Sequence, residues 1–198
     1  MTTICVIPAR GGSQRIHKKN IVDFHGKPII IYSIDGARES GLFDQIVVTT
    51  DSGQIADIAH KAGAHAVWRP AWLAMNEVGT QEVATTTLAM FAPDLQYAAC
   101  VYPTAPMMTP DDLRRGMALL KNNEAQHDFA MAVGSAPLRD AGQWYIGTAA
   151  AFVERRPLIS PRTLMVPIPE DRVCDINTDE DLAEAHRMYT LLHQGIVK

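Results

Sequence analysis

Four basic residues surround a Gly-Gly-Ser turn near the start of the chain. The stretch 7–20, IPARGGSQRIHKKN, has Arg10 before the two glycines and Arg15, Lys18 and Lys19 after them. Glycines let backbone N–H groups approach an anion closely, and nearby cations supply the charge that holds it. The stretch matches neither the P-loop pattern nor the dinucleotide fingerprint. The residue types therefore predict a phosphate site of another kind, and a solvated surface turn is the alternative.

Apolar runs of strand length alternate with segments of helical period, and they place this loop directly after the first strand. Predicted strands cover 4–9, 45–51, 65–70, 97–103 and 129–136, with shorter candidates at 163–169 and 172–176. Predicted helices cover 28–40, 52–63, 80–91, 109–123 and 178–195. Thr109 and Thr178 are the expected N-caps of the last two helices, and Pro110 suits a first helical position.

This alternation, with short connections, predicts an α/β fold in a single domain over residues 1–198. A mostly parallel, Rossmann-like sheet with helices on both faces is expected. Ligands of such sheets bind at the carboxyl ends of the strands. The segments at those ends are PARGGS, TTDS, WRP, YPTAP and CDINT.

Composition excludes several classes of function. The net charge of -4 and the lack of a second Lys/Arg-rich run argue against nucleic-acid binding. No window is long and apolar enough for a membrane span, and the first residues already resemble a strand rather than a signal peptide. The three cysteines, Cys5, Cys100 and Cys174, lie far apart in apolar contexts, as expected of reduced, buried thiols. A cytoplasmic protein is expected.

Seven segments together resemble the nonulosonate cytidylyltransferases, which make CMP-activated acidic nine-carbon sugars such as sialic and pseudaminic acid. In chain order they are IPARGGSQRIHKKN, GKPIIIYSI, GLFDQIVVTTDSGQIADIAHKAGA, RPAWLA, YPTAP, DAGQWY and DINTDEDL. VYPTAP and DAGQWY resemble the pseudaminate branch more than the sialate branch. The resemblance implies a three-layer α/β/α sandwich of the nucleotide-diphospho-sugar transferase type, CTP as co-substrate, Mg²⁺ and a homodimer.

The resemblance also implies roles for individual residues. Catalytic roles fall to Arg10, Lys19 and Asp175, with the first two at phosphate-binding positions. Asp175 and Asn177 stand at the two positions of the family's D-x-D metal motif. The residues implied to bind the nucleotide are Ala9, Gly11, Gly12, Ser13, Gln14, Asn20 and Arg69, with Arg69 near the cytosine. Tyr102, Gln143 and Tyr145 are candidates for the sugar pocket, although buried aromatic residues more often belong to a core.

Two departures from the family remove charge near the reacting phosphate. Gln14 stands where the family usually has lysine, and either Arg15 or Lys18 could take over that charge. Asn177 replaces the second aspartate of the metal motif, and an amide oxygen still ligates Mg²⁺ but carries no charge. Three other carboxylates could compensate, namely Asp51, Asp140 and Asp171.

Two further departures concern the loops. Asn76 occupies a position where the family often has an acid. Only SAPLR, residues 135–139, remains of an interval that in the family holds an insert with dimer contacts and part of the sugar site. In the family, sugar recognition and dimerisation depend on that insert, so its shortening bears on both.

These features lead to two functional hypotheses. The first is an enzyme that transfers a cytidylyl group from CTP to a pseudaminate- or sialate-like sugar acid, releasing pyrophosphate. The alternative is a catalytically impaired nucleotide- or sugar-binding protein on the same scaffold. A narrower variant keeps the enzyme but replaces the sugar with another 2-keto-3-deoxy acid.

Overall fold

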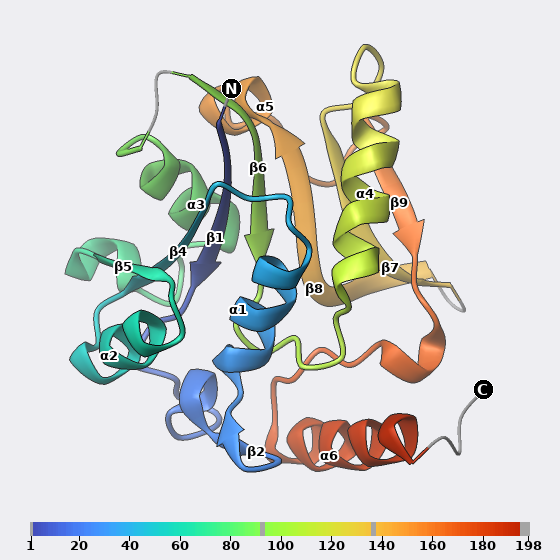
Figure 1. Ribbon diagram of the computed structural model, residues 1–198. Coiled ribbons are helices and arrows are strands. Elements are labelled where there is room, and N and C mark those ends of the chain that lie inside the picture. Colours follow the sequence, from blue (N-terminus) through green and yellow to red (C-terminus); the bar gives the residue numbers. More distant parts are fainter. Residues whose placement is uncertain (1, 92–93, 136–137, 195–198) are drawn as a thin grey trace.

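A seven-stranded sheet forms the centre of the molecule in the computed structural model, which describes residues 2–91, 94–135 and 138–194 (Figure 1). Its strand order is β5-β4-β1-β6-β8-β7-β9. The strands are β1 (Thr2–Pro8), β4 (Gln45–Thr50), β5 (His65–Trp68), β6 (Leu95–Val101), β7 (Phe129–Ser135), β8 (Leu138–Thr148) and β9 (Thr163–Pro167). All neighbours pair in parallel except at β8, which is antiparallel to both β6 and β7. The mostly parallel sheet expected from the sequence is confirmed.

Helices cover both faces of this sheet, as expected. Buried residues of α1 (Ile30–Glu39), α2 (Gly53–Lys61) and α4 (Pro110–Asn123) form one core cluster with one face. Residues of α3 (Thr80–Leu88) and α5 (Ala149–Val153) pack against the other face. Within β1, the buried side chains alternate between the two clusters, because successive residues of a strand point to opposite faces. The result is the three-layer α/β/α arrangement.

The last helix, α6 (Asp179–His193), lies across the carboxyl-end edge of the sheet rather than on a face (Figure 1). Its apolar stripe meets Phe24 and Ile29 in a third cluster of buried residues. Phe24 belongs to a small ladder formed by β2 (Asp23–Phe24) and β3 (Lys27–Pro28). Capping boxes begin α4 at Thr109 and α6 at Thr178, where each threonine hydroxyl accepts a backbone N–H. Both predicted caps are confirmed.

Three predicted elements need correction. The segment 138–148 was not expected to be a strand, yet it forms β8, the longest strand of the sheet. The candidate strand 172–176 is wrong, because its first residue ends a 3₁₀ turn, Glu170–Arg172, and the rest has no strand partner. The first helix begins at Ile30, because Pro28 pairs with Asp23 in the small ladder.

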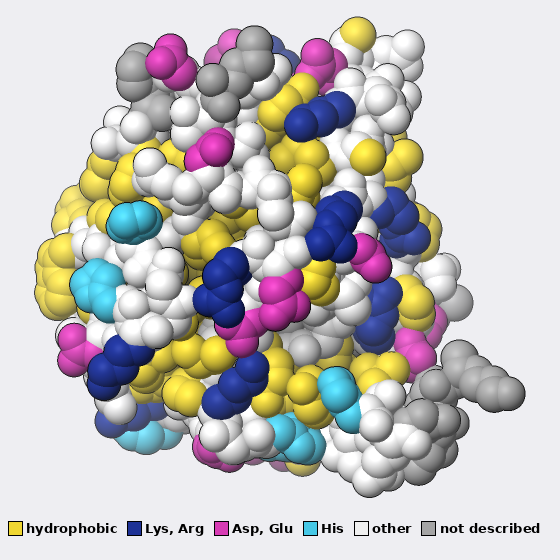
Figure 2. Space-filling model, viewed as in Figure 1, with side chains coloured by type: hydrophobic (Ala, Val, Ile, Leu, Met, Phe, Trp, Pro, Cys, Tyr) yellow, Lys and Arg dark blue, Asp and Glu magenta, His cyan; other side chains and the backbone are white. Residues whose placement is uncertain are grey.

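The surface agrees with the composition. None of the helices in the described ranges is long and apolar enough to cross a membrane. On the face in Figure 2, Lys and Arg side chains are interspersed with Asp and Glu instead of forming one basic area. Cys5 and Cys100 are fully buried, and burial raises the pKa of both thiols.

Candidate active site

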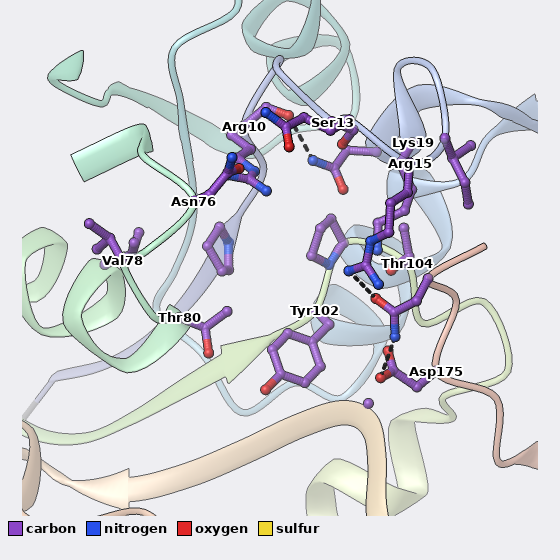
Figure 3. A pocket seen from close by; sticks show the side chains of 18 of the residues that line it. Arg10, Ser13, Arg15, Lys19, Asn76, Val78, Thr80, Tyr102, Thr104 and Asp175 are labelled. Carbon is purple, nitrogen blue, oxygen red and sulfur yellow. Dashed lines mark hydrogen bonds between the residues drawn. The ribbon is translucent and has the colours of Figure 1, made fainter. Parts of the chain in front are cut away.

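A cavity of about 280 Å³ opens at the carboxyl-end edge of the sheet, where the strand rule places a ligand. Its walls come from the loop after β1, the loop after the 3₁₀ turn Ala71–Ala74, the start of the β6–α4 connection, β8, and the segment 173–177 (Figure 3). Because β8 runs antiparallel, its early residues reach the same edge as the carboxyl ends of the parallel strands. One edge of the sheet thus collects residues from five separate parts of the chain.

The glycine loop is anchored to the neighbouring strand by its own amides. The Ala9 amide donates to the carbonyl of Thr49 at 3.0 Å, and the Gly11 amide donates to Asp51 Oδ1 at 2.6 Å. A Cβ on Gly11 would lie only 2.9 Å from Ser52 Cβ, so this close approach requires glycine. Neither Ala9 nor Gly11 lines the cavity, and their N–H groups are engaged within the protein rather than pointing at a ligand.

Side chains of the same loop do reach the cavity. Arg10, Ser13, Gln14, Lys19 and Asn20 all line it, whereas Gly12 does not. Buried Asn20 also holds the loop in shape, because its Nδ2 donates to the Arg10 carbonyl at 2.8 Å. Of the loop residues predicted to bind nucleotide, the structure therefore brings the side chains of Ser13, Gln14 and Asn20 together with the two cations.

The Arg10 guanidinium lies against the loop after the 3₁₀ turn, on one side of the cavity (Figure 3). Its Nη1 donates to Asn76 Oδ1 at 2.5 Å and to the Ala74 carbonyl at 3.4 Å. Both acceptors are uncharged. Arg10 is therefore oriented without being neutralised.

Lys19 stands on the opposite wall, beside the acidic group. Its Nζ donates to the Ile176 carbonyl at 2.5 Å. Burial lowers the pKa of Lys19, and the nearby Arg15 and Arg10 lower it further, while Asp175 opposes the shift. The three cations and Asp175 all line the same cavity.

A short chain of hydrogen bonds joins Arg15 to the predicted metal motif. Arg15 Nη2 donates to Asn177 Oδ1 at 3.0 Å, and Asn177 Nδ2 donates to Asp175 Oδ2 at 2.7 Å (Figure 3). The amide of Asn177 therefore accepts from a cation through the oxygen that a metal ligand would use. Lys18, the other proposed substitute for lysine at position 14, donates instead to Gln54 Oε1 at 3.0 Å and does not line the cavity.

The turn 140–142 lies against Asp175. Asp140 Oδ1 accepts the Gly142 amide at 2.8 Å, and Asp140, Gly142 and Asp175 all line the cavity. Although Asp140 keeps an exposed surface, desolvation by the surrounding protein raises its pKa; the hydrogen bond from the Gly142 amide opposes this shift, and the negative charge of Asp175 adds to it. Asp140 is thus the candidate compensating carboxylate that shares the cavity with Asp175, since Asp51 holds the Gly11 amide and Asp171 does not line the cavity.

Carboxylate oxygens are the ligands that Mg²⁺ prefers in proteins, and it usually takes one or two of them together with substrate phosphates and waters. The described residues contain no group of three or more His, Cys, Asp or Glu that could hold a metal ion. The pair Asp140 and Asp175 nevertheless suits a Mg²⁺ ion that arrives with a triphosphate, because such an ion needs few protein ligands.

Arg69 and Tyr102 form the inner part of the cavity. Arg69 is only 4% exposed, its Nη2 donates to the Thr49 carbonyl at 2.9 Å, and its buried Nε has no hydrogen-bond partner. Burial lowers the pKa of Arg69 to about 10. For the Tyr102 hydroxyl, burial has the opposite effect and raises the pKa, and a hydrogen bond with the neighbouring Thr80 opposes this shift. The Nε of Arg69 is a hydrogen-bond donor with no acceptor among the described residues.

Two predicted sugar-pocket residues lie elsewhere. Gln143 and Tyr145 are each 1% exposed and do not line the cavity. Gln143 Nε2 donates to the Arg172 carbonyl at 2.6 Å, and Tyr145 packs among Phe129 and Phe152 in the core. Both side chains therefore lie behind the cavity wall, where Tyr145 meets the cavity residue Tyr102 at 6.4 Å between ring centroids, and their contact with a sugar stays a prediction.

Sequence reasoning missed several residues of the cavity. They include Met75, Val78, Thr80, Pro103 and Thr104, which the structure places beside Tyr102 and Arg10. Pro103 and Thr104 belong to YPTAP, a strand-end segment that the sequence did flag. The other three follow the third parallel strand by several residues, and no spacing signal marks them.

Comparison with known proteins gives a family match. The chain matches the family described as Cytidylyltransferase over residues 4–161. It is 31% identical over 230 residues to the pseudaminic acid cytidylyltransferase of Campylobacter jejuni subsp. jejuni serotype O:2, which covers 98% of this chain and 99% of that enzyme. It is 36% identical over 103 residues to the N-acylneuraminate cytidylyltransferase of Escherichia coli O18:K1:H7, covering 52% of this chain and 24% of that protein.

The first alignment is longer than the 198 residues of this chain, so the Campylobacter enzyme has residues that this chain lacks. The expected shortening lies between β7 and β8, where residues 136 and 137 are outside the described ranges.

Solved structures share the fold. A CMP:2-keto-3-deoxy-manno-octonic acid synthetase complexed with CTP superposes with a TM-score of 0.74 at 18% identity, covering 98% of this chain and 100% of that one. Rv0371C from Mycobacterium tuberculosis H37Rv, complexed with manganese, gives 0.67 at 16% identity, covering 94% and 99%. With the family match over most of its length and the near-complete alignment to a pseudaminic acid cytidylyltransferase, the chain belongs to the cytidylyltransferase family.

Proposed function

We propose that this protein transfers a cytidylyl group from CTP to an acidic nine-carbon sugar of the pseudaminate type. The observation that carries the proposal is the convergence of Arg10, Lys19 and Asp175 on one cavity at the carboxyl-end edge of the sheet. Family membership supports cytidylyl transfer, and the alignment to a pseudaminic acid cytidylyltransferase supports the sugar class.

In the proposed reaction a sugar hydroxyl attacks the α-phosphorus of CTP. A new P–O bond forms to the sugar, the bond from the α-phosphorus to the bridging oxygen breaks, and pyrophosphate leaves with that electron pair. The hydroxyl proton is lost to solvent or to a nearby carboxylate. Such a reaction depends on holding nucleophile and leaving group in line and on stabilising the charge that develops on the phosphoryl oxygens.

Each cation of the cavity has its own proposed contact with the substrates. Arg10, with uncharged partners, is free to pair with the β- and γ-phosphates of the leaving group. Lys19 is held by the Ile176 carbonyl next to Asp175, which suits contact with the α-phosphate. Arg69 presents its unpartnered Nε to the cytosine end, where a carbonyl acceptor would satisfy it. Tyr102 lines the side toward β8 and is proposed to contact the sugar.

Mg²⁺ is proposed as the metal of the reaction. Asp175 would hold it, and Asp140 rather than Asn177 would supply the second protein oxygen, because Asn177 Oδ1 already accepts from Arg15. When bound, the ion would neutralise part of the negative charge of the triphosphate. Both carboxylates stand at the same wall of the cavity, so the protein contributes position and charge there.

The test is release of pyrophosphate from CTP and Mg²⁺ with a panel of nonulosonic acids. We expect turnover with the wild type and a loss of at least a hundredfold in Arg10→Ala and Asp175→Ala, as for removal of one charge-stabilising group. Thermal unfolding of each variant checks that the fold is kept. Full turnover in both variants would contradict the proposed roles. Replacing CTP with UTP tests whether the enzyme requires the cytosine base.

One observation favours the alternative of a non-catalytic nucleotide- or sugar-binding protein. Arg15, Asn177 and Asp175 form a hydrogen-bonded chain in which both side chains of the metal motif are engaged. In that case the wild type binds CTP without turnover. The double variant Gln14→Lys, Asn177→Asp then distinguishes a scaffold that lacks only those two charges from one that lacks more.

The resemblance also supports two wider proposals. The protein is a homodimer, which sedimentation of the purified chain would test. It works in the cytoplasm, where CTP is made, and fractionation of cells that express it would test that location.

A further inference from the structure

Arg10 lines the cavity without an acidic partner among the described residues. Arg172, just before the segment that carries Asp175, pairs with Asp112, whereas the cavity residues Arg15 and Arg69 donate to an amide oxygen and to a backbone carbonyl. Arg10 forms no ion pair with any acid in the described residues, and its Nη1 donates to the amide oxygen of Asn76 and to a backbone carbonyl. A neutral acceptor orients a guanidinium but leaves its net charge in place.

Asn76 lies where a charge would matter most. It follows the 3₁₀ turn Ala71–Ala74, lines the cavity, and stands 2.5 Å from Arg10 Nη1. A carboxylate differs from this amide by only one atom and would reach the same guanidinium. At such a separation the ion pair would cancel most of the charge that Arg10 offers to an anion.

The other charged and polar side chains of the cavity do not replace the charge of Arg10 on its wall. Lys19 lies beside Asp175, and Arg15 donates a hydrogen bond to Asn177 on the same acidic wall. Arg69 is buried at the inner end and donates to a backbone carbonyl. Gln14, on the loop that carries Arg10, lines the cavity without a charge. Arg10 therefore offers its charge to the cavity from a side chain that forms no ion pair in the part of the chain that the structure describes.

We infer that Asn76 is a positioning residue that aims Arg10 into the cavity and, by being neutral, keeps its charge available for the polyphosphate of the nucleotide. The inference rests on the proposed function, since it presumes that a nucleotide polyphosphate enters this cavity. Asn76 thus tunes affinity for the phosphates and leaves the nucleoside end of the site untouched.

The experiment measures the Kd of CTP and of cytidine for the purified full chain by titration calorimetry. In Asn76→Asp we expect CTP to bind about tenfold more weakly, as one added charge next to Arg10 would cause, while cytidine binds as before. The same loss in EDTA excludes a new metal ligand as its cause. The matched control, Asn122→Asp, places the same charge on the exposed outer side of α4 and should change neither Kd.

A second variant provides rescue. Adding Gln14→Lys to Asn76→Asp returns a cation to the wall of Arg10 and should recover most of the lost CTP affinity, although it does not restore the amide. If Asn76→Asp binds CTP as tightly as the wild type, or weakens cytidine equally, or loses affinity only with Mg²⁺ present, the inference is wrong. If the wild type itself fails to bind CTP, the proposed function fails, and the inference falls with it.

Discussion

The backbone of Gly142 lies directly against the side chain of Asp175. A Cβ at position 142 would be 2.7 Å from Asp175 Cβ and 2.8 Å from its Cγ and Oδ1, and Gly142 has a positive φ of 64°. Its amide meanwhile donates to Asp140 Oδ1. One glycine therefore sets the place of both carboxylates at the wall of the cavity, although neither is its neighbour in sequence.

Replacing Gly142 with alanine should displace Asp175 and abolish most turnover. The positive φ alone costs about 1–2 kcal/mol, and the clash with Asp175 adds to it. The matched control is Gly26→Ala, because Gly26 has a φ of 86° and no atom within 4 Å of an added Cβ. We expect a similar fall in Tm for the strain but full turnover in the control. Equal turnover in both variants would show that the contact with Asp175 has no functional weight.

The second carboxylate can be identified by metal titration. Asp140→Asn removes a charge beside Asp175 while keeping an oxygen that can accept the Gly142 amide. It should raise the Mg²⁺ concentration needed for half-maximal turnover several-fold, because a hard cation binds an amide more weakly than a carboxylate. Mn²⁺ binding in the presence of CTP, followed by electron paramagnetic resonance, gives a readout independent of turnover. Asp57→Asn, on the exposed side of α2, should leave both unchanged.

Much of the scaffold was predictable because its physics is local. Buried parallel strands appear as continuous apolar runs, and the caps at Thr109 and Thr178 follow from residue type. Strand β8 escaped prediction because its first three residues are exposed and its pairing with β6 and β7 is set by distant parts of the chain. The segment 172–176 looked like a strand because Val173, Cys174 and Ile176 are apolar, but Val173 packs against the main core cluster and the other two pack with α6 rather than in the sheet.

The candidate site, too, has one part that the sequence predicts and another that it does not. The strand-end rule brings Arg10, Lys19 and Asp175 to one edge without any knowledge of side chains. The contacts that define their behaviour, such as Arg10 with Asn76, join residues 66 positions apart through loop geometry. No periodicity or spacing in a single sequence encodes such a pair. The burial of Gln143 and Tyr145 behind the cavity wall was not predictable, because β8 itself was not expected from the sequence.

The ion pair between Arg172 and Asp112 should be essential for the segment that carries Asp175. Both side chains are mostly buried, at 16% and 6% exposure, and the Arg172 carbonyl accepts from Gln143. Burial alone would raise the pKa of Asp112, but hydrogen bonds from Arg172 and Thr109 outweigh it and hold this pKa below 3.8.

Arg172→Met leaves that carboxylate buried without its cation and should cost about 3 kcal/mol of unfolding free energy. Chemical denaturation measures this loss. Arg187→Met, which breaks an exposed pair with Glu184, should cost less than about 1 kcal/mol. Comparable losses in the two variants would mean that the buried pair contributes no more than a surface one.

Docking of α6 should weaken in mild acid. His186 stacks on Phe24 at 4.4 Å between ring centroids, and its neighbour His25 lies 4.9 Å away. Burial lowers the pKa of His186 from 6.5, and His25 lowers it further, while Asp23 acts in the opposite direction. The folded protein therefore binds this proton less readily than the unfolded chain, so the neutral imidazole stabilises the fold above pH 6.5 and this stability is lost as the pH falls through the lowered pKa.

The measurement is the unfolding free energy in guanidinium chloride at pH 7.5 and pH 5.5. We expect the wild type to lose stability on acidification and His186→Phe, which keeps an aromatic ring against Phe24, to lose less. His60→Phe, on the exposed side of α2, should follow the wild type. The range from pH 7.5 to pH 5.5 distinguishes this histidine from the paired carboxylates. The pKa values of Asp112 and Asp128 are lowered from the ordinary value, so both stay ionised at pH 5.5. A pH dependence that is the same in His186→Phe as in the wild type would place the titrating group elsewhere.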